Sequence, residues 1–204
     1  MPSNLTNAVA VAAGLFHSLA LKADGTVAGW GGNDLGQLDD VSNLTGVIAI
    51  AAGAYHSVAL KSDGTVTAWG FNDEGQTNAP AGLENVAAVA AEIYTSLALS
   101  VNGTVTAWGD NSHGQTNVPA GLSNVVAISG GAFHCLALKA DGTVAAWGWD
   151  GAGQTDVPAE LTNVAAIASG DYFSIALKTD GTLVFWGDDS DGQTNPPTGL
   201  TNLV

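Results

Sequence analysis

The sequence predicts an all-β fold, a β-propeller built from five repeats of 39 residues. The first observation is a phrase, Asp/Asn-Gly-Thr followed by Trp-Gly, that recurs five times along the 204 residues. Its tryptophans follow one another at steps of 39: Trp30, Trp69, Trp108, Trp147 and Trp186. The second observation is that short apolar segments, separated by glycines and turns, fill each repeat. A fixed period of this length is typical of solenoids, propellers and arrays.

The fourth repeat shows the elements that we expect in each copy. β-branched and small apolar residues predict strands at 124–131, 135–139 and 144–148, with an Asp-Gly turn at 140–143. After a loop at 149–153, the segment 154–158 predicts a short fourth strand or edge. Helices are disfavoured, because every run is short and ends in glycine or proline.

The third observation concerns the faces of the strands, which are apolar on both sides. A sheet with one solvated face would alternate apolar and polar residues, so these sheets are expected to be covered on both faces. Stacking small sheets around an axis achieves this, as in propellers of typically 4–8 blades; a β-solenoid is the alternative. We expect one domain over 1–204, with repeats near 8–46, 47–85, 86–124, 125–163 and 164–202. A closed five-blade monomer is favoured over an open arc that closes by oligomerisation.

Charge and composition exclude several classes of function. The net charge is −15, with four lysines and no arginine, which argues against nucleic acid and against a membrane as partners. Neither a membrane-spanning run nor a signal peptide is visible in this chain. The single cysteine, Cys135, stands where the other repeats have serine, so we expect a small buried side chain rather than a nucleophile. No motif for nucleophilic or phosphoryl chemistry is present, so we expect no enzyme and no cofactor.

Residues 51–91 carry a resemblance to a known family. This segment, together with the motifs HSLALK, AWG and GQT, resembles repeats of the regulator of chromosome condensation family. The short form is most similar to bacterial repeats like those of the beta-lactamase inhibitory protein of the second type. The resemblance implies a propeller, for which that family is known with seven blades, so five repeats depart from it. It also implies an extracellular or cell-surface location and, as an alternative function, inhibition of a secreted enzyme.

Function is expected at one end of the propeller. The loops before the second strand and after the third strand of each repeat should lie at the same end, and they vary most between repeats, whereas the four lysines belong to the opposite end. Aromatic and acidic residues in these loops predict a face that binds a protein partner. The candidate partner-binding residues are Tyr55, Phe71, Asp73, Glu74, Tyr94, Asp110, His113, Trp149, Asp150, Asp188 and Asp189. Drift in solvated loops and self-assembly of the array are the alternatives.

No metal site is expected. His17, His56 and His134 share one column of the repeat, and we expect each to bond nearby backbone. The segment 188–192 resembles part of a calcium loop but lacks the glutamate that would complete it.

Overall fold

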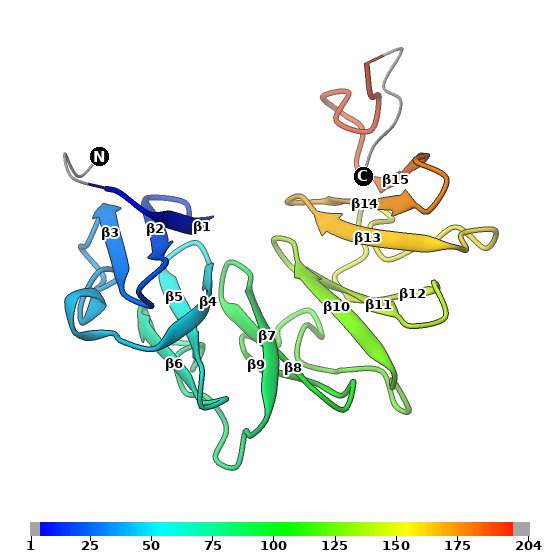
Figure 1. The fold of residues 1–204 in the computed structure, drawn as a ribbon. Helices are drawn as coiled ribbons and strands as arrows, with labels where there is room; N and C mark the ends of the chain where they lie inside the picture. Colours follow the sequence, from blue (N-terminus) through cyan, green and yellow to red (C-terminus); the bar gives the residue numbers. More distant parts are fainter. Residues whose placement is uncertain (1–4, 198–204) are drawn as a thin grey trace.

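The computed structural model describes residues 5–197 and contains five antiparallel sheets of three strands each. Each sheet is one blade, and its strands follow one another in sequence order (Figure 1). The strands are β1 Ala8–Ala13, β2 His17–Lys22, β3 Val27–Gly31, β4 Val47–Ala52, β5 His56–Lys61, β6 Val66–Gly70, β7 Val86–Ala91, β8 Thr95–Ser100, β9 Val105–Gly109, β10 Val125–Gly130, β11 His134–Lys139, β12 Val144–Gly148, β13 Val164–Ser169, β14 Phe173–Lys178 and β15 Leu183–Gly187. A short 3-10 helix, Val41–Asn43, follows the first blade.

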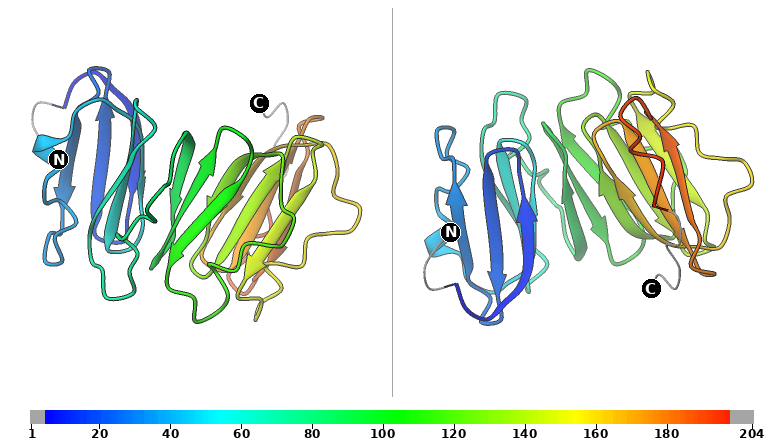
Figure 2. Two further views of the ribbon diagram at one scale, coloured as in Figure 1. Left: turned by 90° about the horizontal axis from the view of Figure 1, so that it is seen from below. Right: turned by 90° about the horizontal axis from the view of Figure 1, so that it is seen from above.

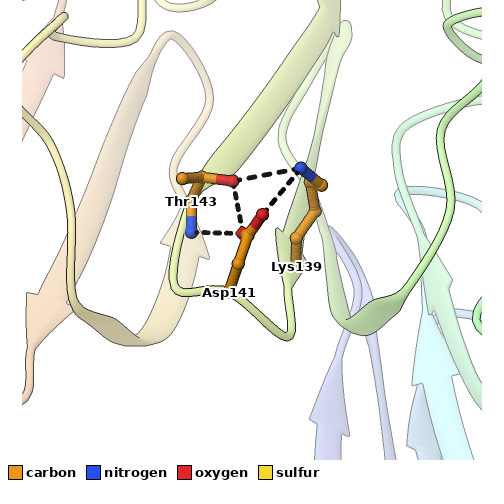
Figure 3. Close-up of polar contacts among 3 residues, drawn as sticks. All are labelled: Lys139, Asp141 and Thr143. Atoms are coloured by element: carbon orange, nitrogen blue, oxygen red, sulfur yellow. Dashed lines mark hydrogen bonds and ion pairs between the residues drawn. The ribbon is translucent and has the colours of Figure 1, made fainter.

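Tight Asp-Gly-Thr turns join the second and third strands of a blade. In the fourth blade Asp141 accepts hydrogen bonds from the Thr143 amide at 3.0 Å and from its hydroxyl at 2.6 Å (Figure 3). Gly142 has a φ of 78°, which a residue with a side chain rarely adopts. The Lys139 ammonium group lies 3.0 Å from the Asp141 carboxylate. The Thr143 hydroxyl, its amide and Lys139 together lower the pKa of Asp141 to about 2. The recurring phrase is therefore a structural element.

The hydrophobic core is divided among the junctions between neighbouring blades. Leu19 and Leu21 of β2 pack against Ala59 and Trp69 of the second blade, and equivalent groups recur at the three following junctions. Trp69 is 7% exposed, which confirms that this tryptophan fills space between blades. Both faces of an internal blade are covered because each face meets a neighbour.

The expected fourth strand does not form. Residues 154–158 of the fourth repeat are turn and irregular structure, like the corresponding segments of the earlier repeats. The reason is that this segment packs onto the next blade instead of extending its own sheet. Val157 and Leu161 lie in the core between the fourth and fifth blades, and the Gln154 carbonyl accepts hydrogen bonds from the fifth blade.

The five blades form an open arc, not the closed ring that we favoured from the sequence. Figure 1 shows the first and fifth blades at the two ends of the arc, and Figure 2 shows the sheets standing side by side in two further views. The hydrogen-bonded junction between blades fixes the rotation from one blade to the next, and four such junctions do not complete a turn. Among residues 5–197, no helix is long and apolar enough to cross a membrane.

Candidate partner-binding surface

Backbone hydrogen bonds fix two loops at the same end of each blade. In each blade the residue that follows the third strand donates its amide to the carbonyl of the aromatic residue before the second strand. Phe71 bonds Tyr55 at 3.0 Å and Trp149 bonds Phe133 at 2.8 Å, and the other three blades repeat the contact. The two loops of every blade therefore lie at the same end, as the sequence predicts. These hydrogen bonds to the strand ends fix the positions of the loop side chains.

Aromatic rings on these loops gather in two clusters. The first contains Phe16, Tyr55, Phe71 and Tyr94; the rings of Tyr55 and Tyr94 stack with centroids 5.8 Å apart. The second contains His113, Phe133, Trp149 and Tyr172. Here Trp149 meets Tyr172 edge-on at 5.3 Å. We call the two clusters together the aromatic face. The structure thus brings five predicted binding residues, Tyr55, Phe71, Tyr94, His113 and Trp149, into contact with aromatic neighbours, which lie up to 39 residues away in the sequence.

The aromatic face remains open to a partner. Phe16 is 59% exposed and Tyr172 is 38% exposed, while Tyr55, Phe71 and Trp149 are half-buried. Trp149 is thus less exposed than an unsupported loop residue would be. Partly exposed rings held by neighbours are suited to a binding surface, since little side-chain entropy remains to be lost.

Four of the six predicted binding acids have structural roles in the loops. Asp110 accepts hydrogen bonds from Ser112 and from the Gln115 side chain, and Asp188 accepts the equivalent set from Ser190 and Gln193. The carboxylates of Asp150 and Asp189 accept the amides of residues five positions later. In the first three repeats an asparagine accepts this amide. The Asn/Asp alternation at this repeat position could have indicated the structural role from the sequence.

Asp73 and Glu74 differ from these four acids. Both are exposed at the tip of the loop that carries Phe71. Over the described residues, 5–197, neither carboxylate has a recorded hydrogen bond or ion pair. These two acids are therefore the carboxylates of the set that are available to a partner.

A cavity of about 300 Å³ lies where the inner loops of all five blades converge. Its wall is mainly glycine and alanine, and the carboxylates of Glu92 and Asp171 also line it. Four residues of the aromatic face, Phe16, Tyr55, Tyr94 and Tyr172, directly follow wall residues in the sequence, so cavity and aromatic face lie at the same end. The four lysines end the second strands, at the opposite end of the blades.

The histidine column serves the junctions between blades. His17 Nε2 lies 2.9 Å from the Ser57 hydroxyl of the next blade, and His56 and His134 repeat this contact with Ser96 and Ser174. This corrects the expected backbone partner. Burial lowers the pKa of all three histidines, that of His56 and His134 to about 4, and so favours the neutral ring. Over the described residues, no group of three His, Cys, Asp or Glu side chains could hold a metal ion.

The serine of each histidine pair also reaches backward to the preceding blade. The Ser57 hydroxyl donates to the carbonyl of Gln37 at 2.9 Å, and the indole Nε1 of Trp69 donates to the same carbonyl at 2.8 Å. The same two donors meet Gln76 and Gln154 at the next junctions. We call this arrangement, in which a serine hydroxyl and an indole N–H donate to the backbone carbonyl of one glutamine, the blade joint.

The joint between the third and fourth blades contains different residues. The sequence analysis singled out Cys135 but not Glu92. Thr95 stands in the histidine column, Cys135 in the serine column, and Glu92 in a column that is otherwise glycine. At Gly53 a Cβ would collide with the His56 ring as well as with the Glu92 carbonyl oxygen, so the ring adds to the need for glycine at this position. With threonine in the third repeat, the space is free for the Glu92 side chain. Comparing the repeats column by column gives this signal.

Glu92 and Cys135 form a buried pair at this joint. The Cys135 thiol donates a hydrogen bond to Glu92 Oε1 at 2.6 Å. Cys135 is 0% exposed and Glu92 is 2% exposed. Within residues 5–197, Glu92 Oε2 has no hydrogen-bond partner. Burial raises the pKa of the Glu92 carboxyl well above its ordinary value, and the nearby Asp110 raises it further. Cys135 is buried, as the sequence predicts, and burial raises the pKa of its thiol.

The fold and the aromatic face define a repeat propeller with a loop-end surface suited to binding. The sequence profile of the Regulator of chromosome condensation (RCC1) repeat matches residues 8–37, 47–76, 86–115, 125–154 and 164–193. The chain therefore belongs to the RCC1 repeat family. No curated protein matches the sequence.

Solved structures with the same fold cover more than this chain does. Prp20p from Saccharomyces cerevisiae, studied with its binding to Gsp1p and histones, superposes with a TM-score of 0.77 at 23% identity over 97% of this chain and 61% of its own. Yeast RCC1 (Prp20) bound to Kap60 gives 0.74 at 24%, over 91% and 57%. The ectodomain of the Physcomitrella patens receptor kinase CR4 gives 0.69 at 27%, over 88% and 50%. The chain thus spans about half to three fifths of these structures.

Proposed function

We propose that the protein is a non-catalytic binding module whose aromatic face, with Asp73 and Glu74, holds a basic segment of a partner protein. The observation that carries the proposal is the pairing of fixed, partly exposed rings with unpartnered carboxylates at an end without lysine. Lysine and arginine side chains bind both groups, through ion pairs and through cation–π contacts. The protein partners of the yeast relatives, Gsp1p, histones and Kap60, support a protein-binding role for the fold.

Charge reversal at the loop tip tests the proposal. The double variant Asp73→Lys, Glu74→Lys should weaken the binding of a lysine-rich peptide at least tenfold, and the remaining binding should depend less on salt. Isothermal titration calorimetry at low and at physiological ionic strength measures both effects. Lys22→Glu, Lys61→Glu at the opposite end is the control, since it changes two charges in the opposite sense and should leave binding nearly unchanged if the site is localised. A gain of binding in this control that is as large as the loss in the loop-tip variant would assign the attraction to net charge and refute a localised site.

Inhibition of a secreted enzyme, such as a beta-lactamase, is the second candidate function. The observation that favours it is the rigidity of the aromatic face, because a preformed surface binds with a smaller entropic loss than a mobile one. We propose an extracellular or cell-surface location for the protein with either of the two functions. Nanomolar inhibition of a purified beta-lactamase that Phe71→Ala removes would support it; inhibition that persists in Phe71→Ala would not.

A further inference from the structure

The cavity at the centre of the arc is small and has a wall of small residues. It has a volume of about 300 Å³ and is bordered by the inner strands and loops of all five blades. Backbone approaches backbone here: a Cβ at Gly14, Gly53 or Gly131 would collide with a carbonyl oxygen of the following blade, so these positions carry no side chain. Ligand pockets in proteins range from about 300 to 1,000 Å³. This cavity is therefore suited to a small group such as one side chain.

The wall of the cavity combines acidic groups with aliphatic surface. Among the described residues, those that line it include two acids, Glu92 and Asp171, and no lysine or histidine. Asp171 is exposed, and over residues 5–197 its carboxylate has no recorded hydrogen bond or ion pair. Leu15 and Ile93 supply aliphatic surface. The chemistry of this wall fits a cation that is carried on an aliphatic chain.

Four departures from the repeat surround the Glu92 carboxyl. Glu92, Thr95 and Cys135 replace the glycine, histidine and serine of the other three joints. The fourth departure is Gly130, where the other repeats have alanine or serine and where a Cβ would lie 2.5 Å from Glu92 Cγ. The chain thus accommodates, beside the cavity, one carboxyl whose Oε2 is buried without a hydrogen-bond partner in residues 5–197. Buried polar atoms of this kind are uncommon in proteins and often have a functional role.

We propose that the cavity binds the ammonium group of one lysine side chain, with Asp171 and Glu92 as its counter-ions. The lysine belongs to the partner's basic segment, so the inference rests on the proposed function and adds a second site to it. A segment that lies on the aromatic face can reach the cavity, because four residues of that face directly follow wall residues. Lysine fits better than arginine, since the described wall offers aliphatic surface for a methylene stem and no aromatic ring for a guanidinium to stack on.

An ammonium group in the cavity should displace the proton of Glu92. Three groups face this carboxyl: the Cys135 thiol from β11, Thr95 from β8 and Asp110 from the loop after β9. Burial and Asp110 raise its pKa, and the hydrogen bonds of Cys135 and Thr95 only partly oppose them. A positive charge nearby favours the carboxylate and lowers this pKa. Binding should therefore release a proton where Glu92 is protonated in the free protein, and the affinity should rise with pH.

The probe n-butylammonium, which is the lysine side chain without a backbone, tests the cavity separately from the aromatic face. Added to the full chain, it should shift the amide NMR signals of Gly130, Gly131 and Gly170, which line the cavity. The uncharged n-butanol should bind at least about tenfold more weakly, because it cannot form the ion pairs. Titrations from about pH 5 to about pH 9 should show an affinity for n-butylammonium that rises with pH.

Two neutral substitutions identify the counter-ions. Asp171→Asn should weaken n-butylammonium binding about two- to fivefold, as expected for an exposed ion pair. Glu92→Gln should weaken it at least about tenfold at the upper end of the pH range and remove the pH dependence. Asp156→Asn is the matched control for Asp171→Asn, because it removes one exposed carboxylate outside the cavity wall. Asparagine already stands at this position in the second, third and fifth repeats.

Three results would overturn the inference: unchanged glycine signals with n-butylammonium, equal affinity for n-butanol, or equal binding in Asp171→Asn and Asp156→Asn. The Asp171 variant keeps the test independent of how well Glu92→Gln folds, since Asp171 is exposed. Failure of the proposed function gives a different pattern. A lysine-rich peptide that binds and is lost in Asp73→Lys, Glu74→Lys, while n-butylammonium does not bind, refutes the cavity site alone. Binding of n-butylammonium with a peptide that ignores the loop-tip variant refutes the aromatic face alone.

Discussion

At the scale of single residues, the buried carboxyl of Glu92 should make the stability of one blade joint depend on pH. It replaces a neutral histidine–serine contact by a carboxyl–thiol contact at the joint between the third and fourth blades. Its pKa is raised in the folded protein, so folding favours the protonated form. The stabilisation is complete below the ordinary pKa of a glutamate and is lost as pH rises through the raised pKa.

We therefore expect Glu92→Gln to change the pH dependence of stability. An amide can still accept the Cys135 thiol proton and has no charge to desolvate, so the melting temperature of the variant should exceed that of the original chain increasingly as pH rises from about 5 to about 8. Thermal melts across this range measure the difference. Glu84→Gln, at an exposed position, is the control and should give a constant offset. A Glu92→Gln offset that is equally constant would show that Glu92 is ionised throughout.

At the scale of elements, strands and loops share the same residue types but give them different roles. Trp108 lies in β9, is 6% exposed and donates to the Gln76 carbonyl at 2.9 Å. Trp149 follows β12, is half-buried and packs edge-on against Tyr172. The first fills a joint between blades, and the second forms part of the aromatic face.

Truncation of these two tryptophans should accordingly have unequal effects. Trp108→Ala should lower the free energy of unfolding by about 3–5 kcal/mol, since it leaves a cavity and an unpaired carbonyl. Trp149→Ala should lower it by about 1 kcal/mol or less, as loop substitutions usually do. Denaturant titrations of both variants decide the matter. Losses of similar size would mean that the second aromatic cluster is part of the core.

At the scale of the whole molecule, the open arc gives residues at the same repeat position different surroundings. Trp30 and Trp69 occupy the same column, yet only Trp69 has an acceptor from a preceding blade. The arc also leaves the cavity at its centre bordered by all five blades but not enclosed by a ring.

Conservative replacement of these two residues measures the inequivalence. Trp69→Phe removes a buried hydrogen bond and leaves the Gln37 carbonyl with one donor fewer, so it should lower the unfolding free energy by about 1–3 kcal/mol. Trp30→Phe should lower it by less than about 0.5 kcal/mol, because water already solvates its indole N–H. Equal losses in urea unfolding would indicate that Trp30 is covered in solution, for example by another molecule. Deletion of Gly199–Val204, a further way to examine the chain ends, concerns residues outside those described.

The sequence by itself determined the repeat, the three strands of each blade, the turns and the end at which the loops meet. These features depend on local chemistry: Asp-Gly for the turn, β-branched residues for the strands, and a period that places each residue type in a fixed column. The tertiary structure decided the rest. In the structure, residues 154–158 pack on the next blade, and Asp110 and Asp188 accept hydrogen bonds within their own loops. Glu92 and Cys135 form a hydrogen bond across a joint. The tertiary structure also decided that the arc stays open, because the rotation between blades depends on how two apolar faces and one glutamine carbonyl pack together, and no local pattern encodes that angle.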